Sequence, residues 1–132
     1  MRKNPKAWAA YNNLGNAIAE FAGLASSLEL FGISRYVSVP VGAWQERCEV
    51  IEGIADSGVT VTFIKKDVYY DRPELYRSPR ADYPDNAERF VFFSKAVAHL
   101  ARHLPWQPEV AHLHDWQAGL AALMIRHQSK LA

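Results

Sequence analysis

The stretch that decides the fold is "EVAHLHDWQAGLAALMIRHQ", residues 109–128, near the C-terminus. It begins with a short apolar run, passes through two histidines and an aspartate, and continues with apolar residues at helical spacing. The pattern predicts a strand over residues 109–114, followed at once by a helix over residues 116–130. Asp115 stands where it would cap this helix, and His114 stands at the end of the strand.

Composition and charge place the chain among ordinary globular domains. It has 132 residues, of which 49% are hydrophobic and 22% charged, and a net charge of +1. No basic patch stands out, so we expect no nucleic-acid partner. The single cysteine, Cys48, fits a reducing compartment. Glu20 and Glu29 interrupt the apolar N-terminal stretch, so we expect no secretion signal, no membrane span and a cytoplasmic location.

The N-terminal segment is predicted to be helical. Aromatic and aliphatic residues recur at helical spacing over residues 5–31, which gives one long helix or a helix pair within residues 1–34. Part of it, "AYNNLGNAIAEFAGLASSLELF", is similar to a helix of a tetratricopeptide repeat, but no second copy follows. We therefore divide the chain into a helical segment, residues 1–34, and a domain portion, residues 35–132.

The domain portion is predicted to be an α/β fold with a parallel sheet and flanking helices. Strands are predicted over residues 35–39, 47–54 and 58–66, and Pro40 is expected to end the first of them. Residues 67–84 are predicted to form an irregular loop. A helix is expected over residues 86–103, with Asp85 and Glu88 forming a start like a capping box. Strand then alternates with helix to the end of the chain, which favours a parallel sheet.

Two junctions between a loop or strand and a helix carry the polar residues of interest. His112 and His114 lie two positions apart on one predicted strand, so their side chains point to the same face. There they could hold a metal ion if a third ligand were present. His114 could equally bond a sugar hydroxyl at the carboxyl end of a sheet strand, or be a buried histidine that fastens the turn. Asp85 is either a helix cap or a carboxylate that faces a cleft, and Tyr70 is either a loop anchor or a ring that stacks on a sugar.

Four blocks occur in one order along residues 41–120. They are "VGAWQERCEVIEGIADSGVTVTFIKK" (residues 41–66), "YDRPELY" (70–76), "YPDNAERF" (83–90) and "HLHDWQAGL" (112–120). In this order and at this spacing they resemble the bacterial glycogen synthase and plant starch synthase family. The resemblance implies a GT-B enzyme, in which two Rossmann-like domains face a cleft, and this chain would supply part of the N-terminal domain.

The resemblance also implies a reaction and a set of residues. Members of the family transfer glucose from ADP-glucose to the non-reducing end of an α-1,4-glucan with retention of configuration, and they use no metal or cofactor. By this resemblance His114 and Asp85 are catalytic and contact substrate, and Asn86 and Tyr70 also contact substrate. The resemblance assigns supporting roles to four further residues: Arg89, His112, Asp115 and Trp116.

Departures from the family pattern set the remaining expectations. The family's Lys-Thr-Gly-Gly-Leu-Ala-Asp phosphate loop is missing, and "EFAGLASSLE" (residues 20–29) keeps only a Gly-Leu-Ala echo. The sequence contains no second domain, so we expect the chain alone to be inactive and able to self-associate through the face that this domain would cover. A non-catalytic glucan-binding or protein-interaction module is the alternative, and a metal-dependent hydrolase built on His112 and His114 is a further one.

Overall fold

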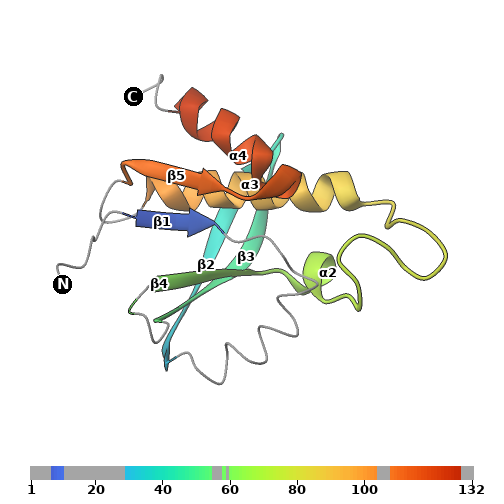
Figure 1. Cartoon of the computed structure of the whole chain (residues 1–132), viewed down its shortest axis with the longest axis horizontal. Coiled ribbons are helices and arrows are strands. Elements are labelled where there is room, and N and C mark those ends of the chain that lie inside the picture. Colours follow the sequence, from blue (N-terminus) through green and yellow to red (C-terminus); the bar gives the residue numbers. More distant parts are fainter. Residues whose placement is uncertain (1–6, 11–28, 55–57, 59, 104–107, 129–132) are drawn as a thin grey trace. The chain divides into compact units, whose positions relative to one another are not determined.

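The computed structural model describes residues 7–10, 29–54, 58, 60–103 and 108–128. The chain divides into two compact units. One unit comprises residues 13–86, and the other comprises residues 1–12 together with 87–132. Figure 1 labels the helices and strands of both units.

The unit of residues 13–86 is built on a three-stranded antiparallel sheet. Its strands are β2 (Glu29–Val41), β3 (Trp44–Ile54) and β4 (Thr60–Lys65), in the order β2-β3-β4. Gly42 has a φ of 63° in the two-residue turn between β2 and β3, a conformation that glycine adopts without steric cost. The register of β2 against β3 shifts between Leu30 and Ser34, so the sheet is irregular at that end.

The centre of one face of this sheet is buried and apolar. Val39, Cys48 and Val50 are 0–3% exposed and alternate with exposed or half-buried neighbours along their strands. Burial raises the pKa of the Cys48 thiol. Beyond the sheet follow the short helix α2 (Asp67–Tyr70) and a loop of residues 71–85. The sheet therefore provides the core of this unit. Its last strand, β4, is followed in the chain by α2 and then by the loop that ends at Asp85.

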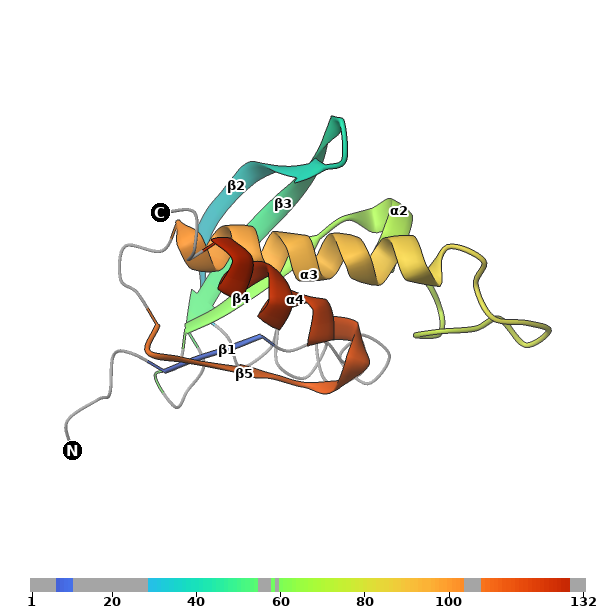
Figure 2. The same ribbon diagram turned by 90° about the horizontal axis from the view of Figure 1, so that it is seen from above.

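The other unit pairs two strands from opposite ends of the chain. β1 (Ala7–Ala10) runs parallel to β5 (Val110–Leu113), with Ala7 opposite Val110 and Ala10 opposite Leu113. The helices α3 (Asn86–Arg102) and α4 (Asp115–Gln128) lie side by side next to this pair (Figures 1 and 2). α3 contributes most of the buried side chains, including Phe90, Phe92 and Val97, and α4 contributes Ala118 and Ala121. Small residues on α4 allow the two helices to approach closely.

Several predicted elements are confirmed. The helices expected over residues 86–103 and 116–130 correspond to α3 and α4, whose last described residue is Gln128. The strands expected over residues 35–39, 47–54, 58–66 and 109–114 correspond to β2, β3, β4 and β5. Pro40 does not end the first of them: β2 continues to Val41, because an edge strand tolerates a residue without an N–H group.

Three predictions need correction. The helix predicted over residues 5–31 is wrong at both ends, because Ala7–Ala10 forms β1 and β2 begins at Glu29. Residues 11–28 lie outside the described residues. The irregular segment 67–84 begins with the helical turn α2. A single parallel sheet is also wrong for the described strands, because β4 pairs antiparallel with its sequence neighbour β3, and only β1 and β5 pair in parallel. The division at residue 34 stays a prediction.

No helix in the described ranges is long and apolar enough to cross a membrane.

Candidate functional site

The loop of residues 71–85, called the Asp85 loop below, is held by hydrogen bonds within its own chain segment. The Tyr83 N–H donates to the Tyr76 carbonyl oxygen (2.9 Å), and the Ser78 N–H donates to the Ala81 carbonyl oxygen (2.8 Å). Arg77 and Asp82 form an isolated antiparallel bridge between these two bonds. The loop is therefore an ordered, hairpin-like excursion that ends at the first residue of α3.

The Asp85 carboxylate accepts hydrogen bonds on both oxygens from one guanidinium group. Arg72 Nη1 lies 2.8 Å from Oδ1, and Nη2 lies 2.5 Å from Oδ2. The Arg72 and Asp85 side chains are 20% and 28% exposed. The hydrogen bond to Asp85, and then the attraction to its charge, raise the pKa of Arg72 above its usual range despite partial desolvation. Such a planar fork fixes the orientation of a carboxylate as well as its position.

Two other predicted substrate residues lie in or near the same loop. The Asn86 side-chain amide donates to the Tyr76 carbonyl oxygen (2.7 Å), so this amide closes the base of the loop. Tyr70 is 7% exposed, and its ring packs edge-on against the ring of Tyr69, with centroids 6.1 Å apart. Asn86 therefore supports the loop that ends at Asp85, and the Tyr70 ring is buried in this structure.

Residues 112–116, called the His114 turn below, connect β5 to α4. The imidazole rings of His112 and His114 stack with centroids 4.3 Å apart and planes at 28°, and both residues are exposed. The two side chains thus share one face, as alternation along a strand requires. Because imidazole can both donate and accept hydrogen bonds, the exposed His114 ring can bond a polar ligand beside the start of a helix.

Asp115 begins α4 in an unusual backbone conformation. Its φ is 62°, in the left-handed region that aspartate tolerates better than most residues. Its carboxylate Oδ1 accepts a hydrogen bond from the Trp116 N–H (2.6 Å), at the end of the helix where backbone donors lack helical partners. The carboxylate thereby stabilises the abrupt change of direction from β5 into α4.

The His114 turn is anchored on α3 by its following residues. The Trp116 ring is 55% exposed and contacts the buried Phe90 ring edge-on, with centroids 4.9 Å apart. The Ser94 hydroxyl donates to the Gln117 carbonyl oxygen (3.0 Å), and both residues are buried. Arg89, one helical turn before Phe93, is fully buried on α3. These contacts fix where the first turn of α4 lies relative to α3.

Asp85 and His114 belong to different compact units, residues 13–86 and residues 1–12 with 87–132. Their shared role at one site therefore stays a prediction.

In the described part of the chain, no group of three His, Cys, Asp or Glu side chains could hold a metal ion. A structural or catalytic zinc site needs at least three protein ligands. Among the described residues, the stacked pair of His112 and His114 has no third protein ligand for a metal ion.

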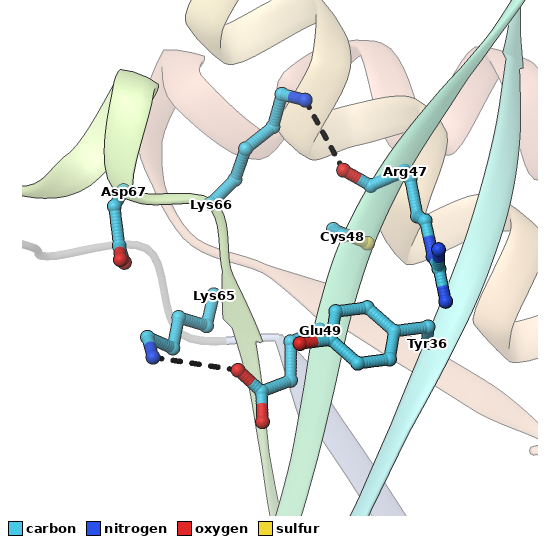
Figure 3. Close-up of a pocket in the computed structure, with 7 residues that line it drawn as sticks. All are labelled: Tyr36, Arg47, Cys48, Glu49, Lys65, Lys66 and Asp67. Carbon is cyan, nitrogen blue, oxygen red and sulfur yellow. Dashed lines mark hydrogen bonds and ion pairs between the residues drawn. The ribbon is translucent and has the colours of Figure 1, made fainter.

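A hollow on the antiparallel sheet was not predicted from the sequence. It has a volume of about 280 Å³ and is lined by Tyr36, Arg47, Cys48, Glu49, Lys65, Lys66 and Asp67 (Figure 3). Its cations already have partners: Lys65 contacts Glu49 (3.4 Å), Lys66 contacts Glu46 (2.7 Å), and the Arg47 guanidinium lies 4.2 Å from the centre of the Tyr36 ring. Cross-strand pairs of this kind stabilise an exposed sheet face, and the hollow receives no functional assignment.

The sequence alone does not reveal the partners that hold the predicted residues. Arg72 lies inside the "YDRPELY" block, but its pairing with Asp85 spans 13 residues of irregular chain and has no periodic signal. Ser94 and Gln117 lie at apolar positions of their helices, and only their burial identifies them as a link. Polar residues at buried helical positions were the one available signal, because such groups need hydrogen-bond partners.

Comparison with known proteins decides the family. A family model described as the starch synthase catalytic domain matches residues 9–131 of the chain. The chain belongs to this family. It is part of a GT-B starch synthase domain, as the four sequence blocks predicted, and the match also includes most of the N-terminal segment.

Individual relatives agree with this assignment. The glycogen synthase of Elusimicrobium minutum is 44% identical over 88 residues, which cover 67% of this chain and 18% of that protein. The glycogen synthase of Koribacter versatilis is 34% identical over 125 residues, which cover 92% of this chain and 25% of that protein. The chain therefore spans a quarter or less of the length of these curated relatives.

A solved structure shows the same fold. It is the catalytic domain of starch synthase IV from Arabidopsis thaliana, bound to ADP and acarbose. The likeness has a TM-score of 0.60 at 21% sequence identity and covers 83% of this chain and 24% of that one. At this identity the comparison establishes the fold of the chain.

Proposed function

We propose that the chain supplies part of a retaining glucosyltransferase site, which transfers glucose from ADP-glucose to the non-reducing end of an α-1,4-glucan. The match of the starch synthase family model over residues 9–131 carries this proposal. Transfer requires both substrates to be held and the departing diphosphate to be stabilised. Because the chain spans a quarter or less of its curated relatives, we expect it to bind a substrate without turnover.

In this proposal His114 acts through its position at the end of a strand. Its imidazole is exposed directly after β5 and before the first turn of α4, where it can bond a hydroxyl of the donor glucose. We assign β1, β5, α3 and α4 to one edge of a Rossmann-like sheet, in which ligands bind beyond the carboxyl ends of parallel strands. The parallel pairing of β1 with β5 supports this assignment.

Asp85 acts in the proposal as an oriented carboxylate. Its side chain is 28% exposed, so a ligand can reach the carboxylate. ADP-glucose and an α-glucan are the proposed ligands, in line with the ADP and acarbose bound to the Arabidopsis starch synthase IV domain. We propose no metal and no further cofactor, and a cytoplasmic location.

The test measures transfer and binding on the same protein. The chain is incubated with ADP-[14C]glucose and glycogen, and both label in the glucan and co-sedimentation of the chain with glycogen are recorded. We expect co-sedimentation without label. Equilibrium dialysis should show weaker ADP-glucose binding in His114→Ala but not in His127→Ala, a substitution of an exposed histidine near the end of α4. A chain that neither labels nor binds glucan or ADP-glucose would contradict the proposal.

A second candidate function, a non-catalytic interaction module, has one observation in its favour. Trp116, Leu120 and Leu123 are 42–66% exposed and recur at helical spacing on α4. An exposed apolar face of this kind favours self-association. Light scattering after gel filtration tests it: Leu123→Glu should leave a monomer if this face joins two copies, and an unchanged mass in both proteins would remove the candidate.

A further inference from the structure

The chain passes from strand to helix within two residues at the His114 turn. On one side, β5 ends at Leu113, which lies opposite Ala10 of β1. On the other side, α4 begins at Asp115. The backbone angles of His114 and Asp115 therefore set the path between the paired strand and the helix.

Both ends of this junction are held by contacts with other elements. β5 is paired with β1, and the Trp116 ring at the start of α4 contacts the Phe90 ring of α3. The Gln117 carbonyl oxygen accepts a hydrogen bond from the Ser94 hydroxyl (3.0 Å). Because the strand and the first turn of the helix are both fixed, the junction must take the backbone angles that connect them.

Asp115 has the backbone conformation that makes this connection. Its φ is 62°, and among the residues that the structure describes it is the only one other than glycine with a positive φ. A side chain in this left-handed region lies too close to the following carbonyl oxygen, and aspartate and asparagine tolerate it better than most residues. Conformations of this kind gather at functional sites, where the surrounding structure maintains them.

We propose that Asp115 is the positioning residue of His114, and that its left-handed backbone conformation rather than its charge directs the imidazole toward the sugar. This inference rests on the proposed function, in which His114 bonds a hydroxyl of the donor glucose. The His114 ring follows the last residue of β5 and stacks on the His112 ring, with centroids 4.3 Å apart. An ordinary right-handed or extended conformation at Asp115 would turn the chain differently, so the ring and the start of α4 could not both keep their places.

Three substitutions separate the ways in which Asp115 could act. Asp115→Asn keeps the left-handed conformation and an oxygen that accepts the Trp116 N–H, and it removes the charge. Asp115→Gly removes the side chain but keeps the conformation, because glycine adopts a positive φ without steric cost. Asp115→Ala removes the same carboxylate and disfavours the conformation. The comparison of Asp115→Gly with Asp115→Ala therefore isolates the backbone angle.

Gly42→Ala is the matched control. Gly42 has nearly the same φ, 63°, in the turn between β2 and β3. A β-carbon at this position would meet no atom within 4 Å apart from its chain neighbours. The substitution thus introduces the same backbone cost without a clash, at a turn that has no part in the proposed site.

The experiment measures ligand affinity and the surroundings of the His114 ring on each variant. Equilibrium dialysis with ADP-glucose gives the affinity, NMR of the labelled histidine rings reports the stacking on His112, and urea unfolding shows that each variant is folded. We expect Asp115→Asn, Asp115→Gly and Gly42→Ala to bind within about twofold of the wild-type chain, and Asp115→Ala to bind on the order of tenfold more weakly. The His114 ring signals should shift further in Asp115→Ala than in Asp115→Gly.

Two results would overturn the proposal. Equal affinity in folded Asp115→Ala and Asp115→Gly would show that the backbone angle does not position His114. Binding by Asp115→Asn as weak as that by Asp115→Ala would assign the effect to the charge. If Asp115→Ala does not fold, Asp115→Gly decides alone: wild-type affinity supports the proposal, and weakened binding in the folded variant contradicts it.

Failure of the proposed function gives a different result. If the wild-type chain does not bind ADP-glucose, the substrate assignment is wrong for this chain, and the NMR signals of the His114 ring decide the positioning role. A larger shift in Asp115→Ala than in Asp115→Gly would support it. Equal shifts in these two variants would show that the left-handed conformation does not determine where the ring lies.

Discussion

The Asp85 loop and the His114 turn hold their polar side chains in opposite ways. Both Asp85 oxygens bond the Arg72 guanidinium, and both side chains are partly buried. The His114 ring is exposed and stacks on the ring of His112, and its turn is fixed by contacts of Trp116 and Gln117 with α3. The Asp85 carboxylate is therefore bonded to a residue of its own loop, while the His114 ring lies on a turn that is held by contacts with α3.

The largest effect should come from the aromatic anchor of the turn. Phe90 is 3% exposed and contacts Trp116, so Phe90→Ala should lower the free energy of unfolding by about 3 kcal/mol, as is typical for a buried phenylalanine. Urea denaturation measures this loss. Phe93→Ala, at another buried α3 position, is the control: only Phe90→Ala should shift the indole N–H NMR signal of Trp116. A loss below about 1 kcal/mol would contradict the anchoring role.

Removing the carboxylate of the loop should have the next largest effect. Asp85→Ala leaves the Arg72 guanidinium partly buried without its carboxylate acceptor, so we expect a loss of about 2 kcal/mol in the free energy of unfolding. Asp82→Ala, a change in the same loop, should alter it by less than about 0.5 kcal/mol. Equal values for the two variants would show that the fork contributes nothing to the loop.

The link between α3 and α4 should contribute less. Ser94→Ala removes the hydroxyl that donates to the buried Gln117 carbonyl oxygen, and we expect a cost of about 1 kcal/mol. Ser38→Ala, on β2, should cost less than about 0.5 kcal/mol. Thermal unfolding of both variants measures the difference. If Ser94→Ala is as stable as Ser38→Ala, the hydrogen bond from Ser94 to Gln117 does not stabilise the His114 turn.

A pH dependence of stability should arise from His99 on α3. Desolvation, and then the nearby charges of His103 and Arg102, lower the pKa of His99 below its ordinary value of 6.5. Protons then bind the unfolded chain more readily, so stability is full above pH 6.5 and falls as the pH drops below that value. His99→Gln should reduce this fall in a series of urea denaturation measurements at different pH values, and an unchanged fall in the folded variant would contradict the prediction.

The smallest effect on stability is expected at His114 itself. Because its ring is exposed, His114→Ala should change the free energy of unfolding by less than about 0.5 kcal/mol. Calorimetric unfolding of this variant beside Asp85→Ala therefore measures the contrast between the two regions directly. A loss at His114 as large as that at Asp85 would mean that the imidazole is also a structural group.

Residue periodicity and residue type along short stretches predicted several of the helices and strands. The periodicity of residues 86–103 gave α3, and the β-branched run at residues 58–66 gave β4. β1 was missed because "AWAA" has little strand character and pairs with β5, about a hundred residues away in sequence. Asp85 and His114 could be singled out by motif, but the Arg72 fork could not, because it depends on the path of an irregular loop.

We propose that Asp85 and His114 each bind ADP-glucose. An NMR titration of the 15N-labelled chain with ADP-glucose tests it most directly, by following the backbone amide signals of the residues next to Asp85 and of those in the His114 turn. Both groups of signals should shift together and fit one dissociation constant. Shifts confined to one of the two regions, or two unrelated dissociation constants, would contradict it.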